Sequence, residues 1–132
     1  MCSEVNALKI AFFDSGMGGL SVLHHARKVL PHEQFIFYAD EDHVPYGTKT
    51  REQVQEYVGK AFAFLLKQDV KAIVVACNTA TSVAVAKMRS IYDIPIIGME
   101  PAAKKALDAV YDIYYPVVQA VDGDYELKIE FK

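Results

Sequence analysis

The chain has 132 residues, the size of one ordinary domain, and 52% of them are hydrophobic while 23% are charged. This balance supplies enough apolar side chains for one core and excludes intrinsic disorder. The formal net charge is -3, from 14 basic and 17 acidic residues. Because nucleic-acid binding needs a basic patch, we expect no nucleic-acid partner.

The first residues and the two cysteines indicate the compartment. Residues 1–8 lack the charged-then-apolar pattern of a signal peptide. No apolar run approaches the ~18 residues that a membrane-spanning helix needs. Cys2 and Cys77 are too few and too far apart for a disulfide framework. We therefore expect a cytoplasmic chain without a membrane partner.

The first half of the chain alternates between apolar runs and amphipathic stretches. Residues 9–13 read as a buried strand that ends in a tight turn. Residues 18–30 read as a helix that Pro31 ends. A second strand is predicted at 34–39, and the polar segment 40–50 is predicted to be a loop.

The alternation continues beyond residue 50. Helical spacing of apolar residues predicts a helix at 51–68. A third strand is predicted at 71–76, followed by a helix at 78–91 and a short strand at 95–98. A proline at a first helical position begins a predicted helix at 101–110.

This order predicts an α/β domain over residues 1–110. The strands are continuous apolar runs, which is typical of a parallel sheet with helices on both faces. The tail, residues 111–132, reads differently, because 125–131 alternates polar and apolar residues like an added strand. It is either such a strand or a truncated remnant of a second domain.

Three unusual loops follow predicted strands, at Asp14-Ser15, at 45–47 and at 77–79. In open parallel sheets, ligands bind beyond the carboxyl ends of the strands. We therefore expect these loops to converge, although they lie far apart in the sequence.

Cys77 is the first candidate for chemistry. It follows a strand and precedes a helix that Asn78 or Thr79 would cap. A thiol at a helix N-terminus faces the positive end of the helix dipole, which favours the thiolate. The alternative is a buried structural cysteine, a common place for this residue.

Asp14 and Ser15 are the second candidate, because an aspartate that closes an apolar strand is too polar for the core. It could orient a substrate ammonium or tune a thiol, or it could be a turn residue bonded to its own backbone. The glycines at 16, 18 and 19 fit neither nucleotide-binding fingerprint, so we expect no nucleotide cofactor. They could instead offer backbone N–H groups to a carboxylate.

The remaining polar positions have weaker signals. Residues 40–43, DEDH, have metal-ligand chemistry without ligand spacing, so we predict a solvated loop and no metal site, with metal as the alternative. Pro45, Tyr46 and Gly47 form a stiff turn that could meet an anionic ligand. Three histidines are predicted to lie on the surface: His24, His25 and His32.

With these motifs identified, the sequence resembles the glutamate racemases. The resemblance rests on FDSGMGGLSVL at 13–23, VPYGTK at 44–49 and ACNTAT at 76–81. PIIGMEP at 95–101 also fits and is less specific. Together the motifs cover about residues 9–109, in the family's order.

The resemblance implies a cofactor-independent enzyme that interconverts L- and D-glutamate for peptidoglycan synthesis. In the family, the cysteine matching Cys77 exchanges the α-proton, and the aspartate matching Asp14 assists the thiol or the substrate ammonium. The resemblance also implies substrate-binding positions: Asp14, Ser15, Pro45, Tyr46, Gly47, Asn78 and Thr79.

The chain departs from the family in length. Family members have two α/β domains, and the second supplies another cysteine in a Cys-Thr-His motif that this sequence lacks. We therefore expect a truncated or rearranged form. The alternatives are a homodimer that pairs two Cys77 thiols across one site, and a non-catalytic domain that binds an acidic amino acid. A racemase of aspartate is a further alternative.

Overall fold

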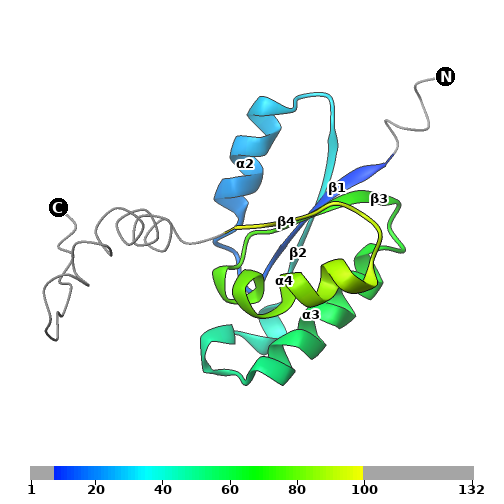
Figure 1. The fold of residues 1–132 in the computed structure, drawn as a ribbon. Helices are drawn as coiled ribbons and strands as arrows, with labels where there is room; N and C mark the ends of the chain where they lie inside the picture. Colours follow the sequence, from blue (N-terminus) through cyan, green and yellow to red (C-terminus); the bar gives the residue numbers. More distant parts are fainter. Residues whose placement is uncertain (1–7, 100–132) are drawn as a thin grey trace, which may run out of the picture. The chain divides into compact units, whose positions relative to one another are not determined.

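The computed structural model describes residues 8–99, which form a four-stranded parallel sheet flanked by three α-helices (Figure 1). The predicted helix 101–110, the tail 111–132 and Cys2 lie outside the described residues. The main elements are β1 (Lys9–Asp14), α2 (Leu20–Val29), β2 (Gln34–Ala39), α3 (Arg51–Leu65), β3 (Val70–Val75), α4 (Asn78–Ile91) and β4 (Ile96–Gly98).

The sheet has the strand order β2-β1-β3-β4, and each neighbouring pair is parallel. Phe13 in β1 lies between Tyr38 of β2 and Val75 of β3. Because all strands point the same way, their carboxyl ends meet at one edge of the sheet. The predicted parallel α/β fold is confirmed.

Helices cover both faces of the sheet: α2 lies on one face, and α3 and α4 lie on the other (Figure 1). Alternate residues of each strand point to opposite faces. The face under α3 and α4 holds the main core, where the Phe13 ring meets Phe62 of α3 edge-on. By contrast, none of the residues of α2 is buried. The core is therefore concentrated on one side, with these residues fully buried: Phe13, Val54, Val58, Phe62, Leu65, Ile73, Val75 and Met88.

Local signals explain the element boundaries. The Thr50 hydroxyl accepts the Gln53 N–H and the Gln53 side chain accepts the Thr50 N–H, so a capping box begins α3. That helix ends at Leu65, before the predicted residue 68, and Asp69 turns the chain into β3 with φ of 57°. Helix α4 has the predicted bounds.

The predicted loop 40–50 is more ordered than expected. It contains two 3₁₀ turns, η1 (Glu41–His43) and η2 (Tyr46–Thr48). Among the helices of residues 8–99, none has the length and apolar character to cross a membrane.

Candidate active site

Cys77 is the N-cap residue of α4, directly beyond the end of β3. Its sulfur accepts the backbone N–H of Ala80 at 3.4 Å, and its thiol lies 3.5 Å from the Ser15 hydroxyl oxygen, to which it donates. A donor from the first helical turn and the helix dipole both favour negative charge on the sulfur. The side chain is only 6% exposed, yet it lines an open cleft.

That cleft has a volume of about 490 Å³ and lies at the carboxyl edge of the sheet. The first and third predicted loops meet there, together with the end of β4. Its walls come from Asp14, Ser15, Gly18, Gly19, Ser21, Val22, Ala76, Cys77, Asn78, Thr79 and Met99. A small dicarboxylate is well within the size that such a space accepts.

Asp14 is buried, and both of its carboxylate oxygens bind backbone N–H groups. Oδ1 accepts the Ser15 N–H at 2.7 Å, and Oδ2 accepts the Gly19 N–H at 2.6 Å. The carboxylate thus closes the turn between β1 and α2. The Ser15 hydroxyl lies 3.5 Å from Oδ1 and 3.5 Å from the Cys77 sulfur. A polar chain therefore joins the aspartate to the thiol.

Gly19 allows this turn to approach the end of β3. A Cβ at this position would lie 2.9 Å from Ala76 Cβ and 3.0 Å from Asp14 Oδ2, closer than side chains pack. The glycine therefore serves a close approach. It brings the start of α2 against the residue that precedes Cys77.

The second predicted loop is anchored by Tyr46, which is 2% exposed and packs between Phe13 and Tyr57. Burial, its hydrogen bond to Asp40 and the charges at Asp40 and Cys77 raise the pKa of Tyr46 well above its usual range. Its turn, η2, contacts α4. The cleft beside Cys77 is nevertheless lined by the other two loops, and 45–47 do not contribute to its walls.

Asp40 supports the second predicted loop from below the surface and does not line the cleft. The prediction of a solvated loop at 40–43 is wrong for this carboxylate, which is 7% exposed. It accepts the Tyr46 hydroxyl at 2.5 Å and lies 2.8 Å from His43 Nδ1, while its N–H donates to Asp14 O at 3.0 Å. An acidic residue directly after an apolar strand, as at Asp14, was the available signal.

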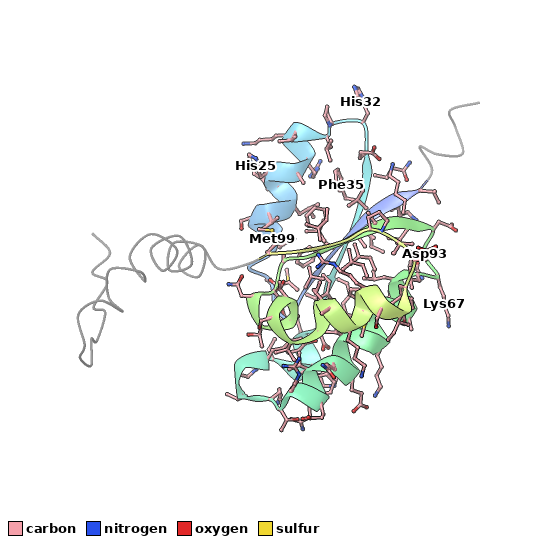
Figure 2. All side chains as sticks on the ribbon, viewed as in Figure 1. His25, His32, Phe35, Lys67, Asp93 and Met99 are labelled. Atoms are coloured by element: carbon pink, nitrogen blue, oxygen red, sulfur yellow. The ribbon has the colours of Figure 1, made fainter. Side chains whose placement is uncertain are left out.

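Of the other polar candidates, Asn78 and Thr79 line the cleft and the three histidines do not. His24, His25 and His32 are exposed, as predicted, and Figure 2 shows His32 extending outward beyond the end of α2. Asn78 is exposed and Thr79 partly exposed in the first turn of α4. Across residues 8–99, no three His, Cys, Asp or Glu side chains gather as a metal site would require.

The fold is that of a known class of proteins. Residues 20–114 match the model of the Asp/Glu/hydantoin racemases, and the chain belongs to that family. Within it, the chain is similar to glutamate racemase 2 of Bacillus subtilis (strain 168), with 55% identity over 101 residues. The glutamate racemase of Campylobacter curvus is 54% identical over 101 residues. These matches cover 76% of this chain and 38% of each relative.

Solved structures of glutamate racemases also match this chain. A Thermus thermophilus glutamate racemase in complex with β-chloro-D-alanine matches with a TM-score of 0.68 and 44% identity, over 70% of this chain and 36% of that one. The Escherichia coli glutamate racemase in complex with L-glutamate and an activator matches with a TM-score of 0.69 and 36% identity, over 75% and 38% of the two chains. This chain therefore spans about two fifths of the length of the relatives it matches.

Proposed function

We propose that this chain carries one acid/base half of a glutamate racemase, with Cys77 as the thiol that exchanges the α-proton on one face of the substrate. The single observation that carries the proposal is the position of the Cys77 sulfur. It lies at the N-terminus of α4, within reach of an Ala80 N–H and the Ser15 hydroxyl, on the wall of an open cleft. The family match and the glutamate racemase relatives support the choice of reaction.

The chemistry of racemisation explains why a thiol belongs in this place. The reaction removes a weakly acidic α-proton and returns one from the opposite face. A base must lie within hydrogen-bond reach of that proton. It must also be able to take up the proton and release it again near the working pH. In the proposal, the thiolate of Cys77 takes the proton and the resulting thiol gives it back.

The substrate carboxylates need donors, and the cleft offers two sources. The first turn of α4, with Asn78 and Thr79, presents free backbone N–H groups at the positive end of its dipole. The turn at Gly18 and Gly19 also lines the cleft, and there Gly18 is the candidate donor, because the Gly19 N–H already donates to Asp14 Oδ2. Donors that hold the reacting carboxylate also stabilise the charge that develops as the proton leaves.

In the proposal, Asp14 assists the Cys77 thiol indirectly, through Ser15. Its carboxylate orients the turn that carries Ser15, and Ser15 reaches the sulfur. Pro45, Tyr46 and Gly47 belong to the substrate-binding set by resemblance, and Tyr46 holds that loop against the core. The proposal needs no cofactor, and its product, D-glutamate, would serve cytoplasmic peptidoglycan synthesis.

A single thiol can exchange a proton on one face only. The sequence has two cysteines, and Cys2 stands in no motif comparable to that of Cys77. The second acid/base group must then come from elsewhere, as from a second copy of this chain in the homodimer alternative. We therefore expect one-sided exchange from the monomer and inefficient racemisation.

The test is deuterium incorporation at the α-carbon of L- and D-glutamate in D₂O, with the oligomeric mass measured in the same sample. Exchange into one enantiomer by a monomer supports the proposal, and exchange into both by a dimer supports paired sites. Cys77→Ser should slow exchange by about 100-fold or more, because the acid/base group is lost. Cys2→Ser is the matched control and should leave exchange unchanged. Calorimetric binding of glutamate without any exchange would overturn the proposal in favour of a binding domain.

A further inference from the structure

Thr81 joins three elements at the carboxyl edge of the sheet. Its hydroxyl donates to the carbonyl oxygen of Val75, at the end of β3, over 3.3 Å. The Thr81 hydroxyl oxygen in turn accepts the N–H of Met99, just beyond β4, at 3.0 Å. Since the Met99 N–H also donates to Val75 O at 3.1 Å, the three groups form a closed set of hydrogen bonds.

Gly98 leaves the space that the Thr81 side chain needs in this orientation. A Cβ at Gly98 would lie 2.6 Å from Thr81 Cγ2 and 3.3 Å from Thr81 Oγ1. The branched threonine has few staggered positions to which it could turn. The bare backbone at 98 therefore leaves room for the methyl group while the hydroxyl faces β3 and β4.

The contacts of Thr81 bear directly on the cleft. Its backbone N–H donates to Cys77 O at 2.9 Å, which closes the first turn of α4. Within that turn, the Ala80 N–H points at the Cys77 sulfur. Met99 lines the same cleft, and Figure 2 shows it at the end of β4. The Thr81 side chain thus connects the helix turn that begins at the thiol to Met99, which lines the same cleft.

We propose that Thr81 is a positioning residue that holds the first turn of α4 so that the Ala80 N–H stays directed at the Cys77 sulfur. Thr81 does not line the cleft and acts through the backbone of Val75, Met99 and Cys77. Without its hydroxyl, the turn would be free to shift against β3. The Ala80 N–H would then point less directly at the sulfur, and the sulfur would be less well aligned with the helix dipole. The role rests on the proposed function of Cys77, but its effect on the thiol is measurable without turnover.

The first test compares Thr81→Val with Thr81→Ser in the full chain, on a Cys2→Ser background that leaves one thiol. The readouts are the pH–rate profile of iodoacetamide alkylation and the ¹³Cβ chemical shift of Cys77. For Thr81→Val we expect alkylation at pH 7 to slow by about two- to five-fold, the size of a helix-terminus charge effect. The rate profile should move to higher pH. Serine keeps the hydroxyl and should restore the wild-type profile.

The second test changes Gly98, the residue that faces the Thr81 side chain. Gly98→Ala should push the Thr81 methyl away and reproduce the effect of Thr81→Val. Combining Gly98→Ala with Thr81→Ser removes the methyl that meets the new Cβ, so the double variant should recover most of the thiol reactivity.

A lower melting temperature in Thr81→Val with an unchanged pH–rate profile and Cys77 chemical shift would overturn the positioning role. Thr81 would then be purely structural. Loss of thiol reactivity without any deuterium exchange by the parent chain would support the role of Thr81 and contradict the proposed function instead. The two proposals are therefore tested separately.

Discussion

The hydroxyl of Tyr46 donates to the buried carboxylate of Asp40 over 2.5 Å, and this bond ties the 3₁₀ turn η2 to the end of β2. Asp40 is also paired with His43, whose ring stacks on Tyr57 at 3.8 Å between centroids. The loop between β2 and α3 is therefore held by a polar network under the aromatic rings. Its tip, including Gly47, stays exposed beside α4.

This bond predicts a loss of stability at alkaline pH. Burial and the Asp40 bond raise the pKa of Tyr46, so the folded chain keeps the phenolic proton after the unfolded chain, with a pKa of about 10, has released it. The stabilisation is complete below pH 10 and is lost as the pH rises further. Between pH 10 and 11, the urea unfolding free energy should fall about 1 kcal/mol more in the wild type than in Tyr46→Phe. Parallel pH profiles would contradict this.

Asp14→Asn should destabilise the chain by about 1–3 kcal/mol at neutral pH. The carboxylate accepts two backbone N–H groups, and an amide would place its own donor against one of them. Urea unfolding measures the change. Asp93→Asn, at an exposed position, is the control and should stay within about 0.5 kcal/mol of the wild type. Equal effects of the two variants would show that the Asp14 turn contributes nothing to stability.

Two glycine-to-alanine variants should have opposite effects. Gly19→Ala places a methyl group 2.9 Å from Ala76 Cβ and should cost about 1–3 kcal/mol. A Cβ at Gly59, within α3, meets nothing within 4 Å, so Gly59→Ala should stabilise by about 0.5–1 kcal/mol. Thermal and urea unfolding distinguish the signs. A neutral Gly19→Ala would mean that α2 can move away from β3 at no cost.

The capping box of α3 gives a prediction that concerns stability alone. Thr50→Ala removes the oxygen that accepts the Gln53 N–H and should cost about 1 kcal/mol. Thr50→Ser retains that oxygen and should lie within a few tenths of a kcal/mol of the wild type. The alkylation rate of Cys77 should be the same in both variants, because Thr50 lies outside its cleft. A change in that rate would contradict the separation of the two regions.

Much of the fold could be predicted from local patterns. The apolar runs mark all four strands of the described residues to within one residue, and α4 has the predicted bounds. Helix α2 begins two residues later than expected, because 17–19 form the turn that Asp14 holds. Sequence spacing cannot show such a turn, since it depends on a side chain five residues away accepting a particular N–H.

The sequence by itself determined the order of strands and helices, the parallel sheet and the position of Cys77 between a strand and a helix. These features follow from hydrophobic periodicity and helix-boundary residues, which act over a few neighbours. Only the tertiary structure decided that Asp40 is buried beneath Tyr46 and that Thr81 joins β3 to the end of β4. Burial and hydrogen-bond partners depend on which distant segments the sheet order brings together, and a polar residue carries no local mark of that neighbourhood.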